Sequence, residues 1–224
     1  MSGPPDVGAI LAVVGMTREA RIVAATPVVV GAGALARRLE GDLSGGLAGV
    51  VSFGLCGALD PALEIGDVLV GEAVSAGAEV IAADAEWSRR LLGALAGALP
   101  ARFAGAERPI ASVPEKAELR RRTGAAAVDM ESASVARLAR RSGTPFAVLR
   151  AVSDTARRPL PSAARVGLGP DGRPAMGAVL ASLAARPWQV GALIRTALEA
   201  EAALRALERA RHLLGPRLGG PDLG

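Results

Sequence analysis

The sequence contains few aromatic residues, one histidine and one cysteine, and these shortages exclude several classes of function. A single cysteine, Cys56, cannot form an internal disulfide, which is typical of a protein of the reducing cytoplasm. A zinc site of histidine and cysteine is not expected, and neither is a histidine-dependent catalytic triad, because His212 lies in a polar helical stretch. We therefore expect no metal cofactor, and we expect carboxylates to perform any chemistry.

The basic residues do not follow the pattern of a nucleic-acid-binding protein. Lys+Arg is 26 against 22 Asp+Glu, and Lys116 is the one lysine among scattered arginines. With three Phe, two Trp and no Tyr, the chain lacks the stacking rings of a single-stranded nucleic-acid site. No apolar run is long enough to span a membrane. Residues 7–14 are interpreted as a buried strand, because no basic region precedes them.

Apolar runs alternate with helical patterns along the chain, which predicts a single α/β domain over residues 1–214. We expect three α/β/α layers around a central, mixed, twisted sheet, a long C-terminal helix at about 188–214 and a disordered tail at 215–224. The expected strands are 8–14, 27–30, 49–53, 67–74, 79–82, 110–112, 125–129 and 146–153, with a glycine-bearing turn at 54–57. The expected helices are 17–25, 32–39, 84–99, 114–122, 131–141, 176–185 and 188–214, with a long loop at 154–174.

Three carboxylates follow predicted strands, and these are Glu19, Glu131 and Asp154. Ligands of open α/β sheets bind at the carboxyl ends of strands, so these positions suit a catalytic site. Taken singly, each is better explained as an exposed acid near a helix start, and only their joint placement favours a site.

The predicted last helix is amphipathic, with leucine, isoleucine and alanine on one face. It could cover the sheet, meet a partner subunit or lie against a membrane. Acidic residues among its arginines favour the sheet or a partner subunit.

Four ordered segments carry a resemblance to a known family. They read GMTRE at 15–19, SFGLCGAL at 52–59, VDMES at 128–132 and RAVSD at 150–154. The set resembles the nucleoside phosphorylase and nucleosidase superfamily. Residues 153–161 and 169–172, with the arginine-rich last helix, are most similar to its hopanoid-associated phosphorylase subgroup, which processes adenosylhopane.

The resemblance implies a role for each acid in cleaving the bond between a purine and a ribose. Asp154 matches the acid that protonates purine N7, and Ser153 orients it. Glu131 matches the residue that binds the ribose hydroxyls, with Met130 packed against the sugar. Glu19 matches the carboxylate that positions or deprotonates water in hydrolytic members.

The remaining matches concern the cleft and the nucleophile. The segment at 54–57 would let the ligand approach the backbone closely, and its residues are Gly54, Leu55, Cys56 and Gly57. Many members have serine where this chain has Leu55, and residues 112–116 lack a base-stacking phenylalanine found in bacterial nucleosidases. Arg18 and Arg21 are candidate phosphate ligands or ordinary solvated arginines. Attack by inorganic phosphate, as a co-substrate, or by water therefore stays open.

The implied activity is cleavage of an adenosine with a large apolar 5′ group, adenosylhopane, giving adenine and ribosylhopane or its 1-phosphate. Two alternatives are a methylthioadenosine/S-adenosylhomocysteine nucleosidase and a non-catalytic purine-binding protein on the same fold. The resemblance also implies a homo-oligomer, at least a dimer, formed through helices such as 114–122 or 131–141. We expect it in the cytoplasm, with peripheral contact at the inner membrane surface as a further hypothesis and no nucleic-acid partner.

Overall fold

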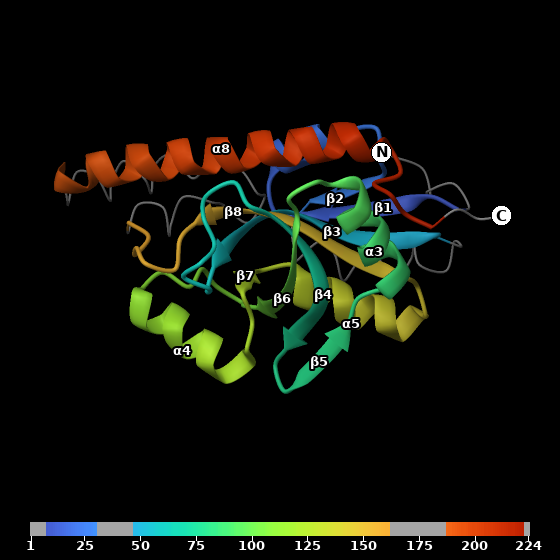
Figure 1. Cartoon of the computed structure of the whole chain (residues 1–224), viewed down its shortest axis with the longest axis horizontal. Coiled ribbons are helices and arrows are strands. Elements are labelled where there is room, and N and C mark those ends of the chain that lie inside the picture. The colour runs from blue at the N-terminus through green and yellow to red at the C-terminus, as the bar shows by residue number, and fades with distance from the viewer. Residues whose placement is uncertain (1–7, 31–46, 162–186, 222–224) are drawn as a thin grey trace.

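A computed structural model describes residues 8–30, 47–161 and 187–221, and eight of its strands form one mixed sheet (Figure 1). The strands are β1 Ile10–Val14, β2 Val28–Val30, β3 Gly49–Ala58, β4 Val68–Ala76, β5 Glu79–Ala82, β6 Leu99–Gly105, β7 Ala127–Asp129 and β8 Phe146–Asp154. The helices are α1 Thr17–Ile22, α3 Ala85–Ala94, α4 Val113–Thr123, α5 Ser132–Ser142 and α8 Val190–Leu214, with a 3-10 turn at Pro187–Gln189 before α8.

The sheet closes on itself, a feature that the sequence did not predict. Its main path runs β2-β1-β3-β7-β6-β4-β5, and β8 pairs with both β3 and β4. The β3–β8 and β1–β3 pairs are parallel, whereas β8 and β4 are antiparallel. The strands β3, β7, β6, β4 and β8 therefore form a closed ring, and closure satisfies backbone groups that open edges would expose.

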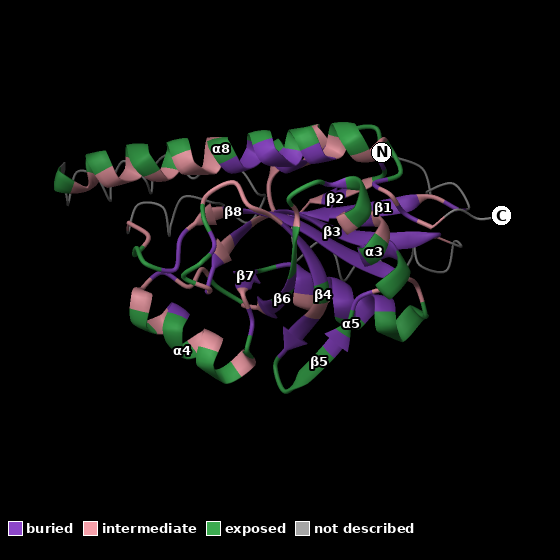
Figure 2. Cartoon of the chain, viewed as in Figure 1, coloured by how far each residue is buried: buried purple, intermediate pink, exposed green. Residues whose placement is uncertain are grey.

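Helices cover both faces of this sheet, as expected for an α/β domain. Val135 and Leu138 of α5 pack in one buried cluster with the strands. Trp87 of α3 and Leu204 and Leu207 of α8 pack in the cluster on the other face. Figure 2 shows the strands buried between these layers. No helix in the described ranges is both long enough and apolar enough to cross a membrane.

The predicted helix over 84–99 is wrong in its second half, and the predicted strand at 110–112 is absent. Helix α3 begins at its Asp84 cap as expected but ends at Ala94, and the chain turns through Gly97 (φ 83°) into β6. Pro100, taken as a helix stop, lies inside β6. Proline is tolerated there because β7 pairs with β6 only from Phe103 onward.

Two further expectations change. The predicted turn at 54–57 belongs to β3, which runs unbroken from Gly49 to Ala58. The predicted disordered tail is packed in its described part: the Trp87 indole N–H donates to the Leu218 carbonyl (3.0 Å), and Leu218 is buried. The expected helices at 32–39 and 176–185, the loop beyond 161 and the tail at 222–224 lie outside the described residues.

Candidate active site

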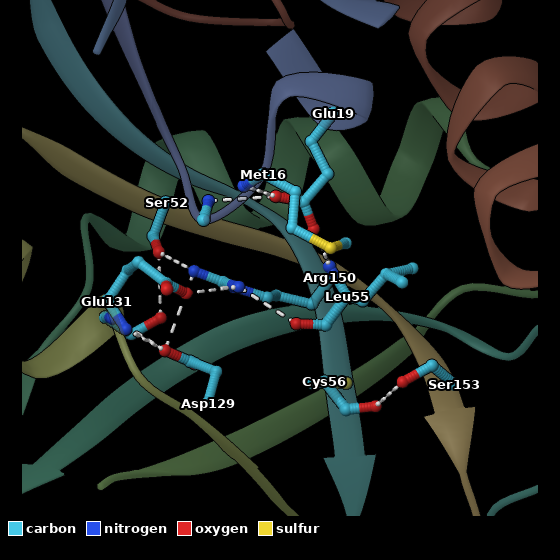
Figure 3. A network of polar contacts seen from close by, with 11 residues as sticks. Met16, Glu19, Ser52, Leu55, Cys56, Asp129, Glu131, Arg150 and Ser153 are labelled. Atoms are coloured by element: carbon cyan, nitrogen blue, oxygen red, sulfur yellow. Dashed lines mark hydrogen bonds and ion pairs between the residues drawn. The ribbon is translucent and has the colours of Figure 1, made fainter. Parts of the chain in front are cut away.

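Glu19 is buried in the first turn of α1 and faces the sheet. Its Oε2 accepts the backbone N–H groups of Gly15 and Met16, both at 2.8 Å, and its Oε1 accepts that of Leu55 at 2.7 Å (Figure 3). The carboxylate therefore joins the turn after β1 to the middle of β3. Its three N–H donors fix both oxygens in place.

Arg150 of β8 lies at the centre of the polar network, with 1% of its side chain exposed. One terminal nitrogen donates to the Leu55 carbonyl (2.9 Å) and pairs with Glu131 Oε2 (2.9 Å). The other donates to Ser52 Oγ (2.6 Å) and lies 3.5 Å from Asp129 Oδ1 (Figure 3). Arg150 thus orients Glu131 and links three strands beneath the predicted ribose site.

The Asp129 side chain binds backbone N–H groups at the start of α5. Its Oδ1 accepts the backbone N–H groups of Glu131 (2.8 Å) and Ser132 (2.6 Å), and Ser132 Oγ donates to Ser52 Oγ (2.9 Å). These bonds set the backbone of Glu131, which precedes the first turn of α5.

Two of the acids around the Arg150 guanidinium, Glu19 and Glu131, have raised pKa values. Burial raises the pKa of Glu19 to about 7, against the opposing charge of Arg150, and the charge of Glu131 adds to the rise. Burial also raises the pKa of Glu131, again opposed by Arg150. A carboxylate with a pKa near neutral can accept a proton and release it again under physiological conditions.

Asp154 ends β8 opposite Gly57 of β3. Its Oδ1 forms an ion pair with Lys116 of α4. Ser153 Oγ donates to the Cys56 carbonyl (3.2 Å; Figure 3) and lies 3.5 Å from Asp154 Oδ2, so its contact with the acid is weak. Burial raises the pKa of Asp154, and Lys116 opposes that rise.

Each of the three predicted acids lies against a glycine. A Cβ atom at Gly15 would stand 2.7 Å from Glu131 Oε1, and one at Gly57 would stand 3.0 Å from Asp154 Oδ2. At Gly54, where φ is 149°, a Cβ would overlap the Glu19 carboxylate. The glycines of the recognised segments therefore make room for the carboxylates themselves.

Gly54→Ala is expected to lower the free energy of unfolding by about 2–3 kcal/mol, because it combines an unfavourable φ with displacement of Glu19. Urea unfolding measures the change. Gly93→Ala in α3 is the matched control, since a Cβ there meets open space and alanine favours a helix. Equal stability of the Gly54 variant and the wild type would contradict the tight fit.

Other predicted site residues lie at the margin of this network. Met130 is 40% exposed between β7 and α5, and Leu55 is half-buried beside Glu19. Cys56 is buried, and burial raises the pKa of its thiol, which disfavours the reactive thiolate. Arg18 is exposed and pairs with Glu201 of α8 (2.6 Å).

Arg21 is exposed on α1, so neither phosphate candidate joins the buried acids. The described ranges also contain no cluster of His, Cys, Asp and Glu that could hold a metal ion.

Sequence reasoning missed Arg150 and Lys116 as site residues. Arg150 begins the segment at 150–154 and lies in a buried strand. An arginine at such a position predicts acidic partners, because a buried arginine requires them. Lys116 is the chain's one lysine, yet nothing in its helical surroundings points to Asp154, which is 38 residues away.

Comparison with known proteins supports the fold and the family. The family described as "Phosphorylase superfamily" matches residues 7–185. No curated protein matches the sequence significantly.

Several solved structures share the fold. A 5′-methylthioadenosine/S-adenosyl homocysteine nucleosidase from Helicobacter pylori is 17% identical, with a TM-score of 0.61 over 93% of this chain and 99% of its own. An S-adenosylhomocysteine nucleosidase from Streptococcus pyogenes is 18% identical, with a TM-score of 0.60 over 88% and 98%. A futalosine hydrolase from H. pylori is 20% identical, with a TM-score of 0.59 over 67% and 89%.

Proposed function

The chain belongs to the phosphorylase superfamily, and on that premise we propose that it hydrolyses the N-glycosidic bond of a purine nucleoside. The observation that carries this proposal is the buried Glu19 carboxylate, fixed by three backbone N–H groups next to Arg150 and Glu131.

In the proposed reaction, Glu131 accepts hydrogen bonds from the ribose hydroxyls while Arg150 holds it in place. Glu19 takes a proton from water as the water oxygen bonds to C1′ of the ribose. The bond from C1′ to N9 breaks, and its electron pair leaves with the purine. Asp154 donates a proton to N7, so the base departs neutral.

Charge favours water over phosphate as the nucleophile. Glu19, Glu131 and Asp129 surround one guanidinium that they already neutralise, so a phosphate dianion would meet net negative charge. Arg18, a candidate phosphate ligand, forms an ion pair with Glu201 on α8. Release of the base should therefore not depend on inorganic phosphate.

The activity should depend on the ionised form of Glu19. With a pKa of about 7, kcat/KM is expected to fall about tenfold per pH unit below 7, and to fall again at high pH where Asp154 loses its proton. Rates from pH 5.5 to 8.5 at constant ionic strength measure this limb. A rate that is flat below pH 7 would remove Glu19 from the role of base.

For the substrate we propose an adenosine with a large apolar 5′ group, and the resemblance of the sequence points to adenosylhopane. Leu55, half-buried beside Glu19, and Met130, partly exposed at the start of α5, would give the cleft an apolar lining. The second candidate is a methylthioadenosine/S-adenosylhomocysteine nucleosidase, which the retained Glu19 and the fold of the solved relatives favour.

A series of 5′-alkylthio adenosines separates the two candidates. If the apolar proposal is right, kcat/KM should rise with chain length, by about fourfold for each methylene that becomes buried. Leu55→Ser should flatten this dependence, whereas Leu213→Ser, at an exposed position near the end of α8, should leave it unchanged. A maximum at methylthioadenosine would instead favour the second candidate.

We further propose that the protein acts in the cytoplasm as at least a dimer. Trp188 in the 3-10 turn and Val190, Ile194 and Leu198 in the first half of α8 expose apolar side chains, and these favour contact with a second copy or a membrane surface. Sedimentation of the purified protein, with and without lipid vesicles, distinguishes a dimer from a vesicle-bound form.

A further inference from the structure

Lys116 lies one turn into α4 and is fully buried, although α4 is otherwise a polar helix with an arginine-rich end. Ser112 and Glu115 form a capping box that fixes the start of α4. The backbone N–H of Leu160 donates to the Ala111 carbonyl (2.9 Å), which joins the start of α4 to the segment that follows β8, and Lys116 reaches across this contact.

The ammonium group of Lys116 has three protein acceptors. It pairs with Asp154 Oδ1, and it donates to the carbonyls of Thr155 (2.7 Å) and Arg158 (3.4 Å). An ammonium has three N–H donors, so each donor of Lys116 has an acceptor. Lys116 is thus tied to Asp154 and to the chain that leaves it.

Stability alone does not account for this arrangement. A buried ion pair contributes little net stability, because desolvation of the two charges offsets their attraction, and apolar residues often replace such pairs without loss. What the pair does fix is geometry. Oδ1 of Asp154 is occupied by Lys116, which leaves Oδ2 free of the ion pair, 3.5 Å from Ser153 Oγ.

We propose that Lys116 is the positioning residue of the acid: it holds Asp154 by Oδ1 so that Oδ2 faces the departing purine, and its charge tunes the acid. This inference rests on the proposed function. Lys116 does not touch the substrate. It acts by fixing which oxygen carries the transferred proton and how readily that proton leaves.

The effect of Lys116 on the pKa of Asp154 depends on the other groups around that carboxyl. Lys116 of α4 is the cation that favours its charged form, and the Ser153 hydroxyl of β8, 3.5 Å from Oδ2, acts weakly in the same direction. Glu199 of α8 has the opposite effect, although Arg158 pairs with Glu199 at 2.8 Å, and the Cys56 thiol of β3 also lies near. Without Lys116, burial and Glu199 are left largely unopposed, and Asp154 retains its proton to a higher pH.

The test compares Lys116→Met and Lys116→Arg with the wild type on two substrates. One is a 5′-alkylthio adenosine, and the other is its N7-methylated counterpart, whose base leaves without a proton at N7. Lys116→Met should lower kcat on the first substrate by about 100-fold, because the acid is misplaced. It should change the rate on the methylated substrate by less than about threefold, since that reaction needs no acid.

The pH profile gives a second readout. In Lys116→Met the fall in rate at high pH, where Asp154 loses its proton, should move to higher pH, and Lys116→Arg, which keeps the charge, should move it back. Asp154→Asn should show the same substrate dependence, and adding Lys116→Met to it should cost little more. Arg121→Met, which removes an exposed cation from the same helix, is the control and should change neither readout.

Equal losses on both substrates would mean that Lys116 only supports the fold, and unchanged rates on both would remove it from the reaction. Either result overturns the inference while the proposed function stands. If the wild type cleaves neither substrate, the proposed function fails and this inference fails with it.

Discussion

Replacing Arg150 with methionine is expected to lower the free energy of unfolding by about 3–5 kcal/mol and to abolish activity. The substitution keeps most of the side-chain volume but leaves Asp129, Glu131 and Glu19 buried without their shared cation. Ser52 Oγ and the Leu55 carbonyl lose a donor as well. Urea unfolding of the variant and the wild type measures the loss.

The loss should depend on pH in a definite direction. Without Arg150, the buried carboxylates have folded-state pKa values further above their unfolded values, so folding favours their protonated forms. Stability is then retained at low pH and lost as pH rises through those pKa values. The variant should be less destabilised at pH 5.5 than at pH 8.

The matched control is Arg140→Met on α5, because Arg140 forms an exposed pair with Glu79. It should cost less than about 1 kcal/mol, as expected for a surface ion pair. Two results would contradict the view that Arg150 neutralises the buried acids. One is an Arg150→Met protein as stable as this control, and the other is an equal loss of stability at both pH values.

Glu19→Gln is expected to lower kcat/KM by about 10²–10⁴-fold, because an amide cannot accept the proton of the attacking water. The amide also places an NH₂ group against a backbone N–H that the carboxylate now accepts, at a cost of about 1–3 kcal/mol in stability. Rates should therefore be compared at a temperature where both proteins are folded.

Glu201→Gln is the control, since this partly exposed acid pairs with Arg18 and not with the buried network. It should leave kcat/KM within about twofold of the wild type. In the Glu19→Gln variant, kcat/KM should also no longer fall as the pH drops below 7. A loss below about fivefold would assign the water to another residue.

Much of the site could be predicted because it depends on where strands end. Glu19 follows β1 and Asp154 ends β8, and both strands run parallel to β3, so these two acids lie at the same edge of the sheet. Glu131 follows β7, which is antiparallel to β3. Strand β5 at Glu79–Ala82 and the ends of α4 and α5 at Gly124 and Gly143 also follow local signals.

The rest depends on contacts between distant segments. The sequence from Ala85 to Leu99 favours a helix throughout, yet pairing with β4 makes Leu99 and Pro100 the start of a strand. Gly54 looks like a turn residue, but it is a strand residue that makes room for Glu19. The pair of Lys116 with Asp154 depends on how α4 docks against β8, which no local pattern encodes.

The central claim is that a purine nucleoside is cleaved by water that Glu19 activates. The most direct measurement is the cleavage of a 5′-alkylthio adenosine in ¹⁸O-labelled water, with and without inorganic phosphate. The account predicts equal release of adenine in both buffers and a free ribose product that carries ¹⁸O at C1′. Adenine release only with phosphate, with a ribose 1-phosphate as the product, would contradict it.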